Sequence, residues 1–114
     1  MIESPKAGGH LGFTSEQLTQ YDDSAYDEEV RGMMDVVRKY AEKYLCKIPI
    51  ILAGGIENKK HSDHAFELGA DAIQVGTRFV TTEECDADQA YKNPYILAKE
   101  ADVAIVKSPV GLPG

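Results

Sequence analysis

The chain has 114 residues, of which 43% are hydrophobic, and a formal net charge of −7 at pH 7. This length suits a single domain with a modest core. The acidic balance argues against nucleic acid and membranes as partners, because nucleic acid and anionic lipid attract clustered Lys and Arg side chains. No apolar run approaches the ~20 residues of a membrane span and no signal peptide is recognisable, so we expect a cytoplasmic protein. Cys46 and Cys85 lack the spacing of a metal site, and we expect reduced thiols.

The N-terminal residues 1–5 look like the end of a strand, and a glycine-rich loop with one histidine follows at residues 6–13. Three glycines within five positions permit unusual backbone angles and a close approach of ligand. His10 is bracketed by these glycines, and its imidazole can exchange a proton near neutral pH. By chemistry alone, His10 is evenly balanced between catalysis and an ordinary place in a loop.

Residues 28–45 carry the clearest periodic pattern. Apolar side chains recur at i, i+3, i+4 and i+7 spacing with charged residues between them, which predicts an amphipathic helix. We expect its two methionines to fill the core. The preceding residues 14–27 are polar and predict an extended connection, with only a weak helical signal at residues 16–18. The apolar face of the helix comprises Val30, Met33, Met34, Val37, Ala41, Tyr44 and Leu45.

The middle of the chain predicts the unit around which the rest is organised. Apolar runs at residues 48–53 and 72–75 are joined by a polar helical segment that starts near Ser62 and ends at Gly69, which predicts a parallel βαβ unit and an α/β fold. The first run stops at Gly54-Gly55 and the second at Gly76-Thr77. Parallel α/β folds place their ligands at this edge of the sheet, so we expect a site there.

Two interpretations of these strand ends are open. In the first, the glycines only terminate strands and make tight turns. In the second, the N–H groups of Gly54, Gly55 and Gly76 and the Thr77 hydroxyl form a phosphate cradle. We favour the cradle, because two small-residue strand ends separated by one helix are a stronger signal than one glycine pair. Gln74 could hydrogen-bond a polar cofactor edge or could equally be packed.

The C-terminal part predicts a loop at residues 81–87, a helix at about 88–99 and a strand or extended segment at 101–107. No domain boundary is visible. Both ends of the chain look like positions inside a larger domain, so we interpret the chain as one incomplete domain. His61 and His64 lie on the polar helix, and we expect both to be solvated at the surface.

Four segments of the chain resemble nitronate monooxygenases, formerly called 2-nitropropane dioxygenases. These segments are KAGGHLGF, IPIILAGGI, LGADAIQVGTRFVTTEECDA and VKSPVGLPG, in that order and spacing. They resemble the C-terminal half of that family and span nearly all of this chain. The FMN-dependent enoyl-ACP reductases are similar, but the TTEECDA and KSPVG stretches favour the monooxygenase branch.

The resemblance implies an FMN-binding (β/α)₈ barrel with a smaller substrate domain added. A complete barrel needs roughly 200 residues or more, so we expect a partial TIM barrel, with residues 80–114 as a substrate-domain or barrel-closing segment. The resemblance also implies that Gly8 lies against FMN and that His10 is the active-site histidine near the substrate. The residues that it implies for the FMN phosphate end are Gly54, Gly55, Gln74, Val75, Gly76 and Thr77.

The implied activity is FMN-dependent oxidation of an alkyl nitronate or nitroalkane with O₂, giving a carbonyl compound and nitrite. Two alternatives stay open: FMN-dependent enoyl-ACP reduction, and a non-catalytic fragment. A partial barrel would expose sheet edges and apolar faces, so we expect a homo-oligomer that covers them. Glu3 departs from the family pattern, since many relatives carry at this position a Gln that contacts the flavin. A carboxylate at this position would disfavour an anionic flavin.

Overall fold

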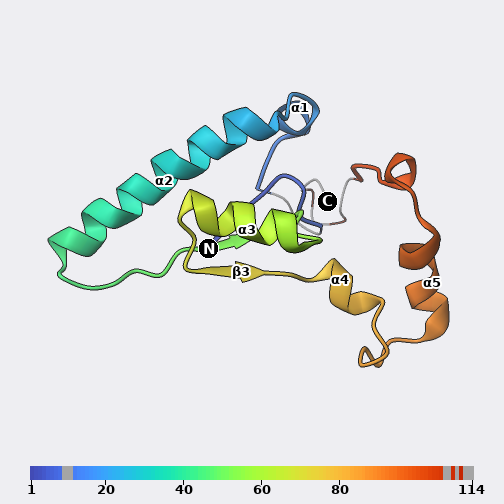
Figure 1. Cartoon of the computed structure of the whole chain (residues 1–114). Coiled ribbons are helices and arrows are strands. Elements are labelled where there is room, and N and C mark those ends of the chain that lie inside the picture. Colours follow the sequence, from blue (N-terminus) through green and yellow to red (C-terminus); the bar gives the residue numbers. More distant parts are fainter. Residues whose placement is uncertain (9–11, 107–108, 110, 112–114) are drawn as a thin grey trace.

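The computed structural model of the chain describes residues 1–8, 12–106, 109 and 111. The predicted catalytic residue His10 lies outside the described residues. The described part is an α/β structure with a parallel sheet in the spatial order β1 (Ile2–Glu3), β2 (Ile51–Ala53), β3 (Ala72–Gln74) (Figure 1). The predicted parallel βαβ unit is therefore confirmed, and the expected strand end near the N-terminus is β1, which pairs with β2.

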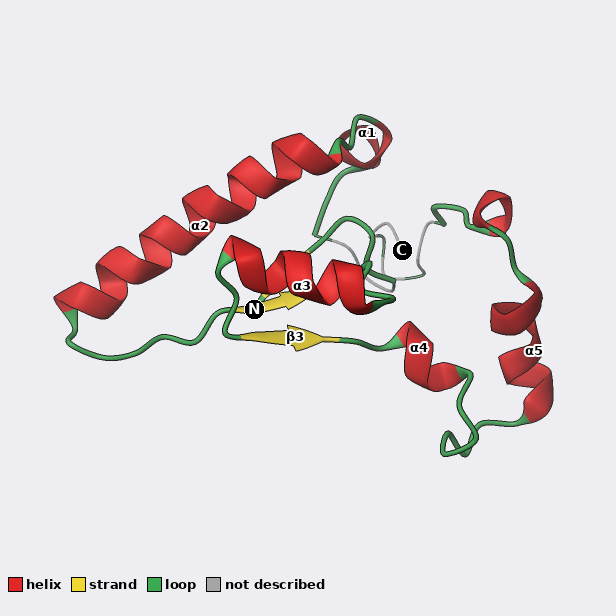
Figure 2. Cartoon of the chain, viewed as in Figure 1, coloured by secondary structure: helices red, strands yellow, loops and turns green. Residues whose placement is uncertain are grey.

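Two helices cover one face of this sheet. Figure 2 shows α2 (Asp23–Lys43) and α3 (Lys59–Leu68) beside the strands that they connect. Ile2 of β1 and Ile73 of β3 pack against the core cluster, and β2 contributes its central leucine. Each strand therefore presents an apolar side chain to the same helix-covered face. The buried residues of this cluster are Val30, Met34, Ile50, Leu52 and Ala65.

The connection before α2 is helical, so the prediction of an extended segment is wrong. α1 (Ser15–Thr19) starts with a capping box in which the Gln17 N–H donates to Thr14 Oγ1, and the Thr14 N–H donates to the Gln17 side chain at 2.8 Å. α2 begins at Asp23 because the Asp22 carboxylate accepts from the Ser24 N–H at 3.0 Å. These caps satisfy free N–H groups at the helix starts, which apolar periodicity does not reveal.

The C-terminal end of α2 turns its last predicted apolar positions toward solvent. Met34 is fully buried, whereas the exposed fractions of Met33, Tyr44 and Leu45 are 40%, 62% and 93%. The helix ends at Lys43, and Leu45 has a left-handed φ of 50°. The prediction that both methionines fill the core is therefore wrong for Met33, since consecutive helical positions point about 100° apart.

Asp71 fixes where the strands β2 and β3 come together. Its Oδ2 accepts from the Ile50 N–H at 2.9 Å, and its Oδ1 lies 2.8 Å from Lys47 Nζ. The hydrogen bond from Lys47 and the one from the Ile50 N–H hold the pKa of this carboxyl below its usual range. Just before it, α3 ends at Gly69 with a φ of 112°, which confirms the predicted C-terminal glycine.

The C-terminal described segment leaves the sheet and extends to one side (Figure 1). It consists of α4 (Thr77–Val80), α5 (Gln89–Leu97) and the 3₁₀ turn η1 (Glu100–Asp102), so the predicted helix at residues 88–99 is confirmed. Residues 101–106 contain no strand, which rules out the strand alternative for the described part of that segment.

One buried lysine organises this segment. Lys92 on α5 is only 8% exposed, and its Nζ donates to the carbonyl of Thr82 at 2.8 Å and to the carbonyl of Cys85. A buried ammonium group needs such acceptors, because an isolated charge is costly to remove from water. Lys92 therefore fixes the loop between α4 and α5 against α5 through these two hydrogen bonds.

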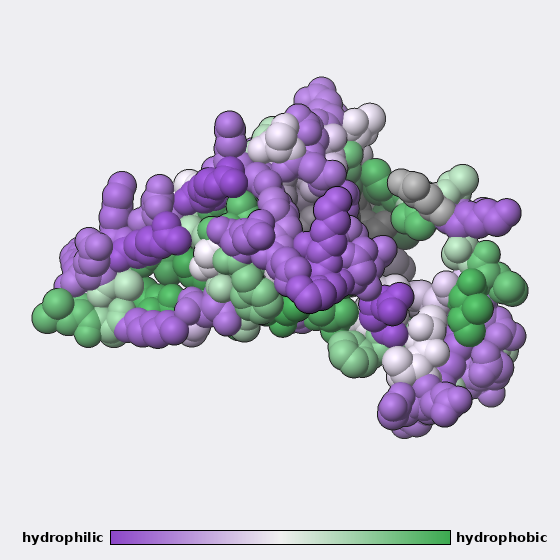
Figure 3. Space-filling view, viewed as in Figure 1, coloured by the Kyte–Doolittle hydropathy of each residue, from purple (hydrophilic) through white to green (hydrophobic). Residues whose placement is uncertain are grey.

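Hydrophobic side chains reach the surface on and after α5. Figure 3 shows hydrophilic residues over much of the molecule in this view and hydrophobic residues on the α5 side. Several of these side chains have more than half of their surface exposed. None of the described helices is both long and apolar enough to cross a membrane. The exposed side chains include Tyr91, Ile96, Leu97, Val103, Ile105 and Val106.

We expect Lys92→Met to loosen the α4–α5 segment. The half-buried Thr82 and Cys85 carbonyls would lose their donor, at about 1 kcal/mol each, the lower end of the cost of an unsatisfied buried group because water reaches them. Hydrogen exchange should become faster in residues 77–97 and stay unchanged in α3. Lys99→Met, at an exposed lysine just after α5, is the matched control. Equal exchange in the two variants would refute the role of Lys92.

Candidate functional site

The predicted cradle residues lie at one edge of the sheet. Ala53 of β2 pairs in register with Gln74 of β3, so Gly54-Gly55 and Val75-Gly76 leave the sheet on neighbouring strands and in the same direction. Thr77 follows as the first residue of α4. The fold therefore brings all the residues predicted for the phosphate end into one region.

Gly54 and Gly55 are required for packing. Both have left-handed backbones, with φ of 90° and 69°. A Cβ on Gly54 would lie 2.8 Å from the Ala7 Cβ, and one on Gly55 would lie 3.0 Å from the Lys6 Cβ. The turn after β1 therefore sits directly on the turn after β2, and only glycine permits both the angles and the contact.

Gly76 and Thr77 face open space instead. Both are exposed, and a Cβ on Gly76 would meet no described heavy atom within 4 Å. Within the described part of the chain, the N–H groups of Gly55 and Gly76 and the Thr77 hydroxyl have no hydrogen-bond partner. Gly8, in the turn after β1, is likewise exposed with open space around it. This edge of the sheet therefore offers hydrogen-bond donors to a ligand.

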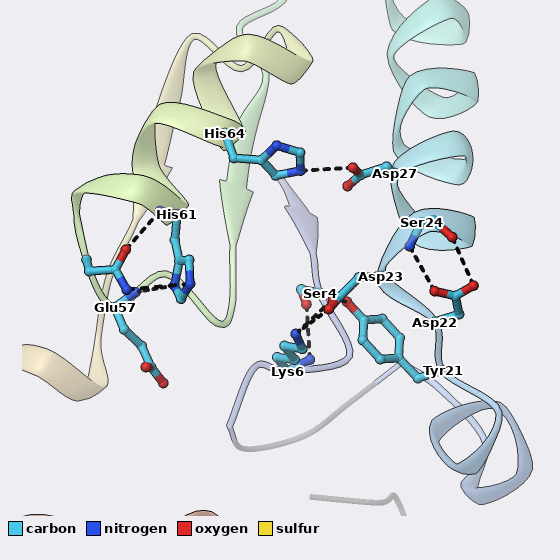
Figure 4. Close-up of polar contacts among 11 residues, drawn as sticks. Ser4, Lys6, Tyr21, Asp22, Asp23, Ser24, Asp27, Glu57, His61 and His64 are labelled. Atoms are coloured by element: carbon cyan, nitrogen blue, oxygen red, sulfur yellow. Dashed lines mark hydrogen bonds and ion pairs between the residues drawn. The ribbon is translucent and has the colours of Figure 1, made fainter.

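A polar network anchors the turn after β1 to the start of α2 (Figure 4). Lys6 Nζ lies 2.8 Å from Asp23 Oδ1 and donates to Oδ2 at 3.0 Å, and the Tyr21 hydroxyl donates to Asp23 Oδ1. The hydrogen bonds from Lys6 and then Tyr21 lower the pKa of the Asp23 carboxyl. Burial, followed by the Asp23 carboxylate, raises the pKa of the Tyr21 hydroxyl. The Lys6 N–H also donates to Ser4 Oγ at 3.0 Å.

No motif in the sequence predicts this network. Its sequence signal is weak, because Lys6 and Asp23 are 17 positions apart and both are common surface residues. The acidic start of α2 at Asp23 lies within residues 14–27, which were predicted as an extended connection, although acidic side chains favour helix N-termini. Only the fold shows that this acidic start lies beside the turn that leads to the glycine-rich loop.

A cavity of about 920 Å³ opens between α2 and α3 on the helix-covered side of the sheet. Of the predicted site residues within the described part, only Gly54 and Gly55 line it. Across it, His64 Nε2 of α3 lies 2.9 Å from Asp27 Oδ2 of α2 (Figure 4). His64 thus joins two helices, and its side chain is 53% exposed, which confirms the expectation that it is solvated at the surface. The cavity is distinct from the open edge at Gly76.

A sequence model of the nitronate monooxygenase family matches residues 1–113. The chain belongs to this family. The predicted resemblance is therefore confirmed. In this nitronate monooxygenase family member, the match includes the turn after β1, the βαβ unit and the α4–α5 segment.

Curated relatives carry the same name. A probable nitronate monooxygenase of Staphylococcus saprophyticus is 32% identical over 113 residues, which are 99% of this chain and 30% of the relative. A probable nitronate monooxygenase of Staphylococcus aureus (strain Newman) is 30% identical over 95% of this chain and 28% of the relative. The nitronate monooxygenase of Paraburkholderia phytofirmans is 36% identical over 76% of this chain and 21% of the relative. The chain thus spans less than a third of the length of these relatives, and no solved structure matches it.

Tyr26 makes the packing of α2 sensitive to alkaline pH. This residue packs against the core, and burial, then the charges of Glu29 and Asp27, raise the pKa of its hydroxyl from 10.0 to about 12. A raised pKa in the folded state means that the stability contributed by the neutral phenol is full below pH 10 and is lost as the pH rises toward 12.

We expect the free energy of unfolding to fall by about 2 kcal/mol across this interval, after allowance for partial exposure of the ring. Urea unfolding at a series of alkaline pH values measures the slope. Tyr26→Phe should flatten it, and Tyr44→Phe, at an exposed position just after α2, should leave it unchanged. A slope that is identical in Tyr26→Phe and in the unsubstituted protein would disprove this assignment.

Proposed function

We propose that the chain forms the FMN phosphate-binding part of a nitronate monooxygenase, on a partial (β/α)₈ barrel. The observation that carries the proposal is the meeting of two glycine-marked strand ends at one edge of a parallel sheet. Barrels of this class build phosphate sites from the loops after consecutive strands at that edge. Membership of the nitronate monooxygenase family supports the same assignment.

The residues present fit a phosphate monoester. Gly55 and Gly76 offer N–H groups that have no partner among the described residues, and Thr77 offers a hydroxyl in the same situation. The open space at Gly76 lets phosphate oxygens approach the backbone closely. These three residues would hold the phosphate, while Gln74 and Val75, at the end of β3, would lie toward the ring system.

FMN, when bound, supplies the redox chemistry that converts an alkyl nitronate and O₂ to a carbonyl compound and nitrite. The contribution of the chain itself is to bind and position. We propose that His10 positions the nitronate or acts on its α-proton, and that Gly8 lies against the cofactor. The contact between Ala7 and Gly54 holds the turn before His10 against the phosphate side of the site.

The proposal assigns residues 80–114 to a substrate-domain or barrel-closing segment. Its support is that α5 extends away from the sheet and exposes apolar side chains, among them Ile96 and Leu97 with exposed fractions of 54% and 75%. Such a surface favours association. We therefore propose a homo-oligomer in which copies of the chain cover the open faces of one another.

We expect Thr77→Val to weaken FMN binding by about tenfold, because a hydrogen bond to a charged phosphate is worth about 1.5 kcal/mol or more. Binding of riboflavin, which lacks the phosphate, should not change. Quenching of flavin fluorescence measures both affinities. Thr81→Val, at the exposed end of α4, is the control and should bind both flavins normally. The assignment of the phosphate cradle would be overturned if the unsubstituted protein did not bind FMN, or if Thr77→Val lost affinity equally for FMN and riboflavin.

We expect His10→Ala to lower the rate of nitrite release from an alkyl nitronate by about 100-fold or more, the usual scale of general acid–base catalysis. FMN affinity should stay within about twofold, since the phosphate contacts are unaltered. His61→Ala, at an exposed position on α3, is the control. An unchanged rate in His10→Ala would remove this residue from catalysis. NAD(P)H consumption with a crotonyl thioester, without nitrite release, would favour the enoyl reductase alternative.

A further inference from the structure

The long helix α2 carries a second apolar stripe, which the described part of the chain leaves largely exposed. Its side chains are spaced three or four positions apart and therefore share one side of the helix. Their exposed fractions lie between 40% and 62%. The members of this outer stripe of α2 are Met33, Val36, Tyr40 and, at the C-cap, Tyr44.

The outer stripe is turned away from α3. Asp27 of α2 forms the ion pair with His64 of α3. Arg38 of α2 lies against Gly69 at the end of α3. Successive helical positions differ by about 100°, which places Asp27 and Arg38 roughly 160° or more around the helix from Val36. Figure 1 likewise shows α3 and the sheet on one side of α2, so the outer stripe lies on the other side.

The aromatic end of the outer stripe is ordered by contacts within the chain. The rings of Tyr40 and Tyr44 stack, with centroids 6.2 Å apart and an interplanar angle of 14°. Lys43 Nζ lies 6.0 Å from the centroid of the Tyr40 ring and 5.4 Å from that of Tyr44. Side chains that are already restrained lose less entropy when a partner binds, so this end of α2 is prepared for contact.

The residues along this side of α2 are arranged symmetrically about Val36. Gly32 lies four positions before it, and Tyr40 lies four positions after it. Two copies of α2 that cross antiparallel at Val36 therefore place the Tyr40 ring of each copy over Gly32 of the other. A Cβ on Gly32 would meet no described heavy atom within 4 Å, so a ring can approach the helix backbone closely there.

The same arrangement joins opposite charges. Glu29 and Lys43 are exposed, and neither has an ion-pair partner among the described residues. They lie seven positions before and after Val36, or roughly 10 Å along the helix axis in opposite directions. An antiparallel copy therefore brings each Glu29 to the partner's Lys43, whereas a parallel copy would place like charges together. Charge complementarity thus favours a second, antiparallel copy as the occupant.

We propose that two copies of the chain associate through the outer stripe of α2, with the two-fold axis at Val36. This inference rests on the proposed homo-oligomer, for which it names a contact separate from α5, and it does not depend on FMN. Each copy contributes the same surface, as a closed two-fold dimer requires. Interfaces below about 1,200 Å² are usually weak, so one pair of helices should dimerise at micromolar concentrations or above.

Sedimentation velocity over a series of protein concentrations measures this association. We expect Val36→Glu to weaken it by about 100-fold, because the substitution places two carboxylates against each other at the axis. Leu97→Glu introduces the same side chain on the exposed apolar surface of α5 and should leave the dissociation constant within about twofold. Val36 is half exposed, so the folded chain tolerates the substitution.

Charge reversal tests the antiparallel arrangement. We expect Glu29→Lys and Lys43→Glu each to weaken self-association by about tenfold, because each variant alone brings like charges together at both ends of the interface. An equimolar mixture of the two variants should associate within about threefold of the unsubstituted chain, because both contacts then join opposite charges. Glu42→Lys makes the same change of charge on a different side of α2 and should have no effect.

The outcomes separate this contact from the proposed homo-oligomer. A chain that sediments as a monomer at every concentration overturns both, and leaves the outer stripe to another partner. An oligomer that is weakened by Leu97→Glu but unchanged in Val36→Glu retains the proposed homo-oligomer and overturns the contact through α2. A mixture of Glu29→Lys with Lys43→Glu that associates no better than either variant alone overturns the antiparallel arrangement. Loss in Val36→Glu together with recovery in the mixture supports the proposal.

Discussion

The parallel pairing of β2 with a strand on either side is the constraint on which the rest of the structure depends. β2 supplies Leu52 to the core between α2 and α3, and its partners β1 and β3 each add one isoleucine beside it. Because the three strands are parallel, their carboxyl ends meet at one edge. The turns that carry Lys6, Gly54 and Gly76 therefore lie at the same edge, although long stretches of sequence separate them.

Contacts between these turns explain why the edge is well defined. Gly54 and Gly55 allow the backbone of β2 to turn directly beneath Lys6 and Ala7, where a Cβ would clash. Asp23 then holds Lys6 from the other side through its carboxylate. The sequence pattern suggests a ligand-binding role for these two glycines, but their first requirement is the close packing against Lys6 and Ala7. The N–H groups of Gly55 and Gly76 and the Thr77 hydroxyl remain free of partners among the described residues at the same edge.

The sequence was sufficient for α2 and the βαβ unit, because both rest on apolar periodicity and on glycine at strand and helix ends. It failed between residues 14 and 27, where hydrogen bonds of Thr14, Gln17 and Asp22 with the backbone start two helices without an apolar pattern. The strand ends of the site were foreseeable from the glycines. The Lys6–Asp23 pair was not, since its formation depends on how β1 and α2 are arranged in space.

The helix-free face of the sheet shows most clearly what the sequence alone leaves open. Strands of a parallel sheet are normally apolar on both faces, because helices or a barrel core cover each of them. Glu3 and Gln74 break this pattern at matching positions of two outer strands, with Ala53 between them. Each position looks unremarkable by itself, and the row exists only once the register is known. Glu3 is half-buried and Gln74 is exposed, so both polar groups remain within reach of water at the carboxyl edge, which offsets the free-energy cost of placing them on a sheet face.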